Sequence, residues 1–288
     1  MIPAAFDYQA PTTIAEALSL LAANPDEGKI LAGGHSLIPA MKLRLAQPGM
    51  LIDIGRIKDL SYIREEGDQI ALGAMTTHYQ IESSALLQKI CPLLPDCASH
   101  IGDVQVRNRG TIGGSVAHSD PAGDWPAAMI ALNARMVVVG RNGERTINAD
   151  DFFVDLLTTA LSPDEILREI RVAKPAGRFG HSYQKVRHPA SGFAVVGIAV
   201  AITLGAQGSC EAASVGVTGV ASKAYRAVAV EAALKGQLLS DQTIAQAAAH
   251  ATDGVDANSD LYASEDYRRH LAQVFTKRAI HQAWISIK

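Results

Sequence analysis

The sequence is poor in cysteine: only 3 of its 288 residues are cysteines, at Cys91, Cys97 and Cys210. They are too few and too scattered for a disulfide framework, which is typical of chains in a reducing compartment. They also cannot hold a [2Fe–2S] cluster alone, because such a centre needs four thiolates, or two thiolates and two histidines. Redox chemistry in this chain would therefore need an organic cofactor, and we expect three small buried thiols.

The sequence also lacks an excess of charge and a long hydrophobic run. Its 26 Lys and Arg against 29 Asp and Glu give a net charge of −3, which does not favour nucleic acid as a partner. The most apolar segment, Phe193–Leu204, has only about 12 residues, whereas a membrane-spanning helix needs ~20, so it is predicted to be a buried strand. The first residues do not resemble a secretory signal, and the predicted location is the cytoplasm.

Several common motifs are missing. Neither G-x-G-x-x-G nor G-x-x-x-x-G-K-[ST] occurs, which argues against a Rossmann dinucleotide site and against a P-loop. The 9 histidines form no H-E-x-x-H motif or Cys/His cluster, so no metal site is predicted. A G-x-S-x-G elbow, the commonest serine hydrolase motif, is also missing.

The composition, 48% hydrophobic and 19% charged, is typical of a folded protein with two domains or one large one. Early in the chain the pattern predicts a helix over Thr13–Ala23, a strand over Lys29–Ala32, a helix over Leu37–Leu45 and a strand over Leu51–Ile54. Further strands are predicted at Ile70–Leu72 and Met136–Val139. The Pro- and Gly-containing link Lys174–Gly177 is a candidate domain boundary.

After this link, strands and helices are segregated along the chain. Two β-rich runs, Phe193–Leu204 and Ala213–Val220, come first. Helical patterns follow over Lys223–Lys235, Ser240–Ala251 and Ser264–Ile287, and in the last of them the expected apolar stripe is Tyr267, Leu271, Val274 and Phe275. Segregated strands and helices predict an α+β domain.

Two glycine-rich segments carry the chemistry. The first, Ala32–Pro39, lies between a predicted strand and a predicted helix, where free N–H groups at a helix start can bind phosphate. Ser36 could add a hydroxyl donor or cap the helix. The second, Arg109–Ser115, continues through two acids to a predicted helix over Ala127–Leu132. Two such turns predict a diphosphate held from both sides.

These residues resemble a known family. Ala32–Pro39, Gly73–Thr77 and Arg109–Ser115, followed by Asp120 and Asp124, are similar to the FAD-binding medium subunit of molybdenum hydroxylases, the xanthine dehydrogenase family. Within that family the resemblance is greatest to the carbon monoxide dehydrogenase flavoproteins, and it extends from the N-terminal residues to Tyr267–Arg269.

The resemblance implies an α+β fold in two parts. Residues 1–176 would form a two-lobed FAD-binding domain of the vanillyl-alcohol-oxidase (PCMH) type, with lobes of about 1–56 and 57–176. Residues 177–288 would form a smaller C-terminal domain of antiparallel sheet and helices.

The resemblance also assigns FAD contacts. The two glycine segments would hold the diphosphate, and the residues concerned are Ala32, Gly33, Gly34, His35, Ser36, Leu37, Gly110, Thr111, Ile112, Gly113, Gly114 and Ser115. Thr77, Asp120 and Asp124 would lie near the ribityl or adenosine portion. Asp124 could instead be a helix N-terminal residue favoured by the dipole. His35 and His118 are expected to shape the turns rather than to move protons.

In the second domain, Lys185 lies in a segment similar to the family's Tyr-x-Lys, and it could either contribute charge to FAD or be a solvated strand lysine. Phe193 stands where the carbon monoxide dehydrogenase subunits have a tyrosine beside the isoalloxazine, which would keep stacking and lose a hydroxyl. Ser115 stands where relatives often have Asn. Both differences argue against carbon monoxide as the substrate.

The function implied is electron transfer, with no catalytic residue and no metal on this chain. Electrons would come from a large molybdopterin-binding partner through a small [2Fe–2S] partner, in a dimer of heterotrimers, reach FAD here and pass to an external acceptor. One alternative is a free-standing FAD oxidoreductase of the same fold with its own small substrate. Another is a nucleotide-binding regulatory module without redox turnover.

Overall fold

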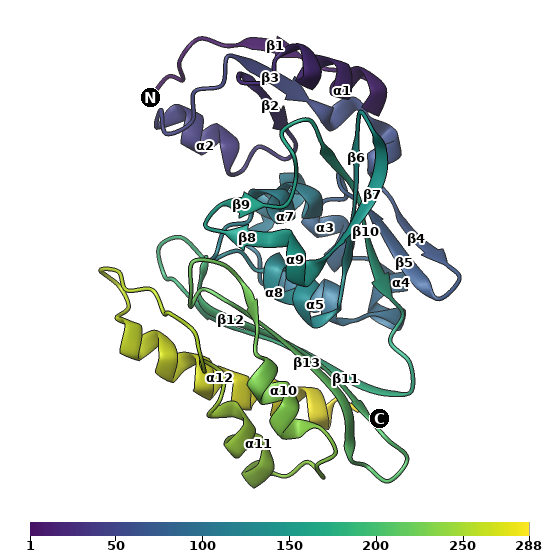
Figure 1. Ribbon diagram of the computed structural model, residues 1–288, viewed down its shortest axis with the longest axis vertical. Helices are drawn as coiled ribbons and strands as arrows, with labels where there is room; N and C mark the ends of the chain where they lie inside the picture. The colour runs from purple at the N-terminus through teal and green to yellow at the C-terminus, as the bar shows by residue number, and fades with distance from the viewer. Residues whose placement is uncertain (288) are drawn as a thin grey trace.

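The computed structural model describes residues 1–287 and divides them among three main sheets stacked along the long axis of the molecule (Figure 1). Each sheet has its own hydrophobic core. The N-terminal lobe lies at one end, a larger middle lobe follows, and the C-terminal sheet with its helices lies at the other end. The predicted α+β class is confirmed.

The N-terminal lobe is a three-stranded parallel sheet in the order β1-β3-β2. Its elements are β1 (Asp7–Gln9), α1 (Ile14–Ala23), β2 (Gly28–Leu31), α2 (Leu37–Lys42) and β3 (Met50–Asp53). Helix α1 begins after Thr13, whose side chain accepts a hydrogen bond from Glu16 N, as expected for an N-cap. The first glycine segment connects the end of β2 to α2.

The middle lobe is a five-stranded antiparallel sheet in the order β4-β5-β10-β6-β7. Its strands are β4 (Ile63–Glu66), β5 (Gln69–Gly73), β6 (Arg135–Gly140), β7 (Gly143–Asn148) and β10 (Ile166–Ala173), with a hairpin of β8 (Phe153–Asp155) and β9 (Thr158–Thr159). Its α-helices are α3 (His78–Glu82), α4 (Ala85–Ile90), α5 (Leu93–Ser99), α6 (Val104–Arg109), α7 (Ile112–His118), α8 (Trp125–Ala131) and α9 (Ala149–Phe152). Two 3-10 turns, η1 (Ile54–Arg56) and η2 (Lys58–Leu60), join the two lobes.

The C-terminal sheet has the order β11-β12-β13-β14 and is antiparallel. Its elements are β11 (Arg178–Arg187), β12 (Ala194–Leu204), β13 (Cys210–Thr218), β14 (Tyr225–Arg226), α10 (Val228–Leu234), α11 (Asp241–Ala248) and α12 (Glu265–Ile285). Helices α10–α12 cover one face, while α5 and α8 of the middle lobe lie against the other (Figure 1). Strand β12 is therefore buried at nearly every position and is the buried strand that the apolar run predicts.

One local prediction in this region was wrong, and another was right only in part. The segment predicted as a helix from Lys223 begins with strand β14, because Arg226 is held beside β13 by Asp150 and Glu231, and the helix starts only at Val228. The predicted apolar stripe of α12 was right only in part: Leu271 is buried and Phe275 packs against the core, but Tyr267 is 48% exposed. The buried face consists of Arg268, Leu271, Ala272, Thr276, Ala279, Ile280 and Ala283. Small residues on this face let α12 approach the sheet closely.

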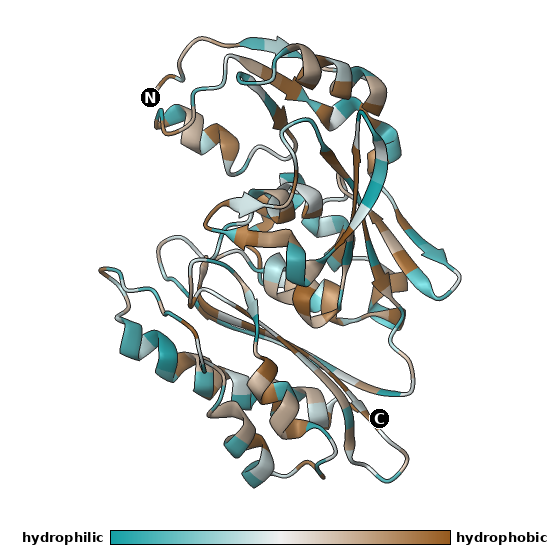
Figure 2. Ribbon diagram, in the orientation of Figure 1, coloured by the Kyte–Doolittle hydropathy of each residue, from teal (hydrophilic) through white to brown (hydrophobic). Residues whose placement is uncertain are grey.

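The cysteines behave as predicted: Cys91, Cys97 and Cys210 are free and buried. No helix within residues 1–287 has both the length and the hydropathy needed to span a membrane. Figure 2 shows hydrophobic residues along the strands and a mostly hydrophilic first half of α12.

Candidate functional site

The two glycine segments touch each other, although they belong to different lobes. A Cβ added at Gly33 would lie 2.4 Å from the carbonyl oxygen of Arg109 and 2.8 Å from Gly110 Cα. A Cβ added at Gly114 would lie 3.3 Å from the Cβ of Ala32. The absence of side chains at these glycines therefore permits the contact, and both turns can face one ligand.

A third segment, Ala74–His78, supports the second glycine segment. Gly113 N donates to Ala74 O at 2.9 Å, Ile112 N to Thr76 O at 3.0 Å, and His78 N to Gly110 O at 3.0 Å. Thr77 and Thr111 form an isolated β-bridge. These bonds fix Thr77 beside the second glycine turn.

Each glycine turn leads into a short helix. In α7, Thr111 is the N-cap, and its hydroxyl accepts from Gly114 N at 3.1 Å. In α2, Ser36 occupies the N-cap position without a side-chain cap bond, so of its two predicted roles the capping role is wrong. Within residues 1–287, the N–H groups of Gly34, His35 and Ser36 have no hydrogen-bond acceptor. His35 and Ser36 are exposed, which leaves a row of donors open to a ligand.

His78 is a site residue that the sequence did not reveal. It is 4% exposed, and its Nδ1 accepts from Trp125 Nε1 at 3.0 Å, so the neutral ring carries its proton on Nε2. A Cβ added at Gly110 would lie 2.7 Å from Nε2. Burial, with smaller contributions from the charges of His35 and Arg107, lowers the pKa of His78 to about 3. No sequence motif marks His78, so the sequence alone could not have predicted its role.

Asp120 and Asp124 belong to one turn between α7 and α8. Asp120 Oδ1 accepts from Ala122 N at 2.8 Å, and Asp120 O accepts from Gly123 N at 2.9 Å. Asp120 Oδ2 lies 4.0 Å from His118 Nε2. His118 thus lies beside the turn that it is expected to shape.

Asp124 and Lys185 are brought together as a buried ion pair across the two domains. Lys185 Nζ lies 2.8 Å from Asp124 Oδ1, and the two side chains are 1% and 5% exposed respectively. Tyr183 donates its hydroxyl to Asp124 at 2.6 Å, and Lys185 also donates to His100 O at 3.1 Å. Burial raises the pKa of Asp124, while the positive charge of Lys185 opposes that change.

This ion pair distinguishes between the alternative roles predicted for Lys185 and for Asp124. Lys185 is buried, so its interpretation as a solvated strand lysine was wrong. Asp124 does stand at the N-terminus of α8, but its side chain makes no cap hydrogen bond and is directed to Lys185 and Tyr183 instead. Both residues therefore anchor the β11 strand to the turn that carries Asp120.

Phe193 and Ser115 are the remaining predicted residues. Phe193 is 44% exposed and precedes β12, in a turn closed by His188 N donating to Phe193 O at 2.8 Å. Ser115 is half-buried in the first turn of α7. Within residues 1–287, the hydroxyl of Ser115 forms no hydrogen bond and the phenyl ring of Phe193 forms no ring pair.

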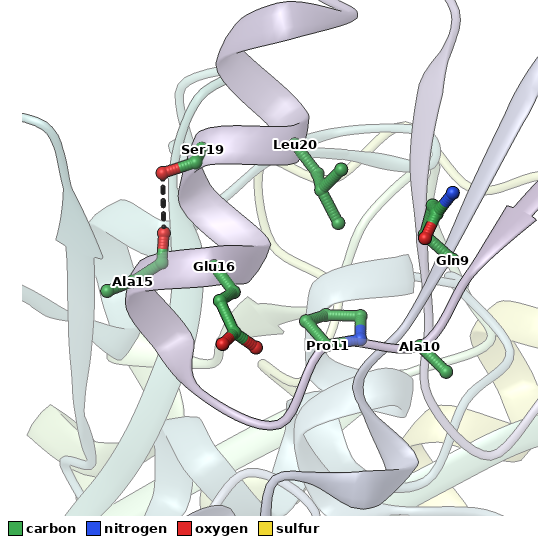
Figure 3. Close-up of a pocket in the computed structure, with 7 residues that line it drawn as sticks. All are labelled: Gln9, Ala10, Pro11, Ala15, Glu16, Ser19 and Leu20. Carbon is green, nitrogen blue, oxygen red and sulfur yellow. Dashed lines mark hydrogen bonds between the residues drawn. The ribbon is translucent and has the colours of Figure 1, made fainter.

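A surface pocket in the N-terminal lobe is a separate feature (Figure 3). It lies between the end of β1 and α1 and is lined by Gln9, Ala10, Pro11, Ala15, Glu16, Ser19 and Leu20. Ser19 turns its hydroxyl to Ala15 O at 2.9 Å. None of the lining residues belongs to the glycine segments, and no cluster of three or more His, Cys, Asp or Glu within residues 1–287 is placed to hold a metal ion.

Comparison with known proteins agrees with this geometry. Residues 4–175 match the family described as the FAD binding domain in molybdopterin dehydrogenase. The chain belongs to this family of FAD-binding subunits. Residues 181–283 of the FAD-binding subunit match the CO dehydrogenase flavoprotein C-terminal domain.

Individual relatives cover the whole FAD-binding subunit. It is 41% identical to the carbon monoxide dehydrogenase medium chain of Hydrogenophaga pseudoflava, over 99% of both chains. The solved carbon monoxide dehydrogenase of that organism superposes with a TM-score of 0.97 at 43% identity and full coverage. Quinoline 2-oxidoreductase from Pseudomonas putida 86 gives a TM-score of 0.93 at 32% identity, with 99% of each chain covered. The predicted family, the two-part fold and FAD as the cofactor are confirmed, and the chain is a subunit of an oxidoreductase.

The residues present fit FAD. The diphosphate of FAD is an anion, and the first glycine turn offers free N–H groups beside a second turn with no side chain in the way. No Lys or Arg side chain is needed in such a site, because main-chain dipoles provide the positive potential.

Proposed function

We propose that this FAD-binding subunit transfers electrons within a molybdenum-containing hydroxylase or dehydrogenase, from iron–sulfur clusters of a partner to an external acceptor. The observation that supports it is the contact between the two glycine turns, with unpaired N–H donors on the first turn. Such a site holds a diphosphate firmly and leaves the rest of the cofactor to neighbouring segments.

We assign the diphosphate of FAD to Ala32–Leu37 and Gly110–Ser115. Thr77, fixed beside the second turn by its bridge to Thr111, and Asp120 are assigned to the ribityl or adenosine portion. Asp124 and Lys185 form a buried ion pair that holds β11 against the turn beside the site, and Phe193 offers an aromatic face to the flavin. His78 supports Gly110 from behind.

Bound FAD supplies the ability to accept electrons one at a time and to release a pair. The chain's own residues bind and orient it. The free N–H groups of Gly34, His35 and Ser36 in the first glycine turn stabilise the charge of the diphosphate, and the neutral imidazole of His78 adds no charge beside the second turn. The Asp124–Lys185 pair adds no net charge, so flavin tuning would depend on dipoles and on aromatic contact.

The partners are proposed from the relatives. Two of them are named medium chains of carbon monoxide dehydrogenase, and another is the medium subunit of nicotine 6-hydroxylase. We infer a large molybdopterin-binding partner and a small [2Fe–2S] partner, assembled as a dimer of heterotrimers in the cytoplasm. Co-purification of the tagged chain with two further chains is the expected result. A chain that purifies alone and oxidises a small substrate would support the free-standing oxidoreductase instead.

The diphosphate site is tested by Gly114→Asp. The new carboxylate would face Ala32 and the bound diphosphate, and its repulsion is expected to remove most of the flavin from the purified protein. Flavin content is measured from the ~450 nm band relative to protein. Gly114→Asn is the matched control, because it has the same size without the charge and should retain more flavin. Full flavin content in Gly114→Asp would refute this assignment.

A further inference from the structure

Arg268, in the first turns of α12, lies far inside the C-terminal domain and is only 6% exposed. Its Nη1 donates to the carbonyl oxygens of Val195 at 2.7 Å and Gly219 at 2.6 Å. Its Nη2 donates to Asp260 Oδ2 at 2.5 Å. The two carbonyls belong to the start of β12 and to the residue directly after β13, so one planar guanidinium joins two strand ends.

The same two strand ends hold the turn that contains Asp120 and Asp124. Three successive carbonyls of this turn accept hydrogen bonds from the C-terminal domain. The pairs are Gly219 N to Pro121 O at 2.6 Å, Ala194 N to Ala122 O at 3.1 Å, and Thr218 Oγ1 to Pro121 O at 2.6 Å and to Gly123 O at 2.8 Å. Arg268 thus binds the carbonyl groups of the two strand ends. The turn accepts hydrogen bonds from the N–H groups of the same strand ends and from the Thr218 hydroxyl.

Gly219 makes this arrangement feasible. Its φ is +83°, and a Cβ there would lie 2.5 Å from Val195 O. Only glycine brings these two main chains close enough for one nitrogen to bind both carbonyls. Within residues 1–287, Arg268 Nε has no acceptor, and an unpaired buried donor destabilises a fold. The contribution of Arg268 is therefore to hold the two strand ends in one conformation.

We propose that Arg268 is a positioning residue for the FAD site, acting through the ends of β12 and β13. It fixes the Asp120–Asp124 turn, and it fixes Phe193, which directly precedes β12. Arg268 itself does not contact the cofactor. This inference rests on the proposed function, because the roles of Asp120, Asp124 and Phe193 at the FAD site are part of that proposal.

The first test uses the full chain without added FAD. Arg268→Met removes all three bonds, and we expect amide hydrogen exchange in peptides containing Ala194 and Gly219 to become about tenfold faster or more. Arg269→Met is the matched control. The Arg269 guanidinium donates to Thr252 O, Val255 O and Glu265, all within the C-terminal domain, so its loss should leave those peptides unchanged.

The second test measures FAD. Arg268→Met should raise the dissociation constant for FAD about tenfold and alter the visible circular dichroism of the bound flavin, while Arg269→Met should change neither. Arg268→Lys should give an intermediate result, because a single ammonium nitrogen would have to replace two guanidinium nitrogens, one of which binds the carbonyls and the other Asp260. Should Arg268→Met fail to fold, the same measurements are made on Arg268→Lys, with Arg269→Lys as its control.

The outcomes separate this inference from the proposed function. A wild-type chain that binds no FAD overturns both. Wild-type binding of FAD, with equal affinity and an identical flavin spectrum in Arg268→Met, overturns the role of Arg268 alone. Equal effects of the two methionine variants on exchange and affinity would also overturn it, because they would show general destabilisation.

Discussion

Among individual residues, His78 shows how a buried polar group supports the cofactor turns. Its Nδ1 accepts the indole N–H of Trp125 in the middle-lobe core, which satisfies two polar groups in one bond. The pKa of about 3 means that the ring stays neutral in the folded protein at any ordinary pH. The ring is neutral mainly because it is buried. The stability of the folded state therefore depends on pH in the acidic range.

The sign of that sensitivity follows from linkage. The unfolded chain binds a proton at His78 below its usual pKa of about 6.5, whereas the folded chain does not until pH falls to about 3. Stability is therefore fully present above pH 6.5 and declines as pH falls, by about 2 kcal/mol at pH 5 from this residue.

His78→Asn tests this, because the amide oxygen can still accept from Trp125 and does not titrate. Between pH 8 and pH 5, the wild type should lose about 2 kcal/mol more unfolding free energy than the variant, measured by urea denaturation. His100 and His181, whose pKa values burial also lowers, are present in both proteins and cancel. Identical pH profiles for the two proteins would contradict a neutral buried His78.

Among the elements, the C-terminal sheet is notable for close helix contacts on both faces. A Cβ added at Gly180 in β11 would lie 2.1 Å from Ala283 O of α12, and one added at Gly216 in β13 would lie 2.1 Å from Ala127 O of α8. Glycines on the sheet face small residues on the helices, so backbone approaches backbone. The middle lobe and α12 are thus packed tightly against opposite faces of one sheet.

Gly180→Ala is expected to destabilise the protein by roughly 1–3 kcal/mol, because the new methyl group has no room and must displace the end of α12. Gly205→Ala is the control. A Cβ added at Gly205 would lie 3.6 Å from its nearest neighbour, and the φ of Gly205 is not positive. The unfolding free energy of the Gly205→Ala variant should therefore stay within about 0.5 kcal/mol of wild type. Chemical denaturation gives both values, and equal midpoints for the two variants would disprove the tight contact.

Elements with regular periodicity were predictable from the sequence. Helix α1 and strands β2, β3 and β12 lie within one or two residues of their predicted positions, because each carries one clear apolar face or run in its sequence. Strand β14 and the buried face of α12 were not predictable. They depend on distant partners, the acids around Arg226 and the glycine at position 180, which a local pattern does not contain.

For the whole molecule, the candidate site joins segments from all three sheets. The glycine turns were visible as motifs, and their contact follows from Gly33 and Gly110 lacking side chains. The contribution of the C-terminal domain was visible only in part, through Lys185 and Phe193. The sequence left Lys185 open between a charge near FAD and a solvated strand lysine, and only the structure shows its pair with Asp124. The anchoring of the Asp120–Asp124 turn depends on main-chain bonds without a sequence pattern.

The same organisation separates the cysteines. Cys91 and Cys97 lie in the core of the middle lobe, whereas Cys210 lies in the core of the C-terminal domain. Burial raises the pKa of Cys91 to about 12 and that of Cys210 to about 11, so the thiolates that iron requires are disfavoured. We therefore expect the isolated chain, reconstituted with FAD, iron and sulfide, to show flavin bands without iron–sulfur absorption or bound iron. The heteromeric complex is the positive control. Stoichiometric iron in the isolated chain would contradict the proposal that electrons reach FAD from clusters on a partner subunit.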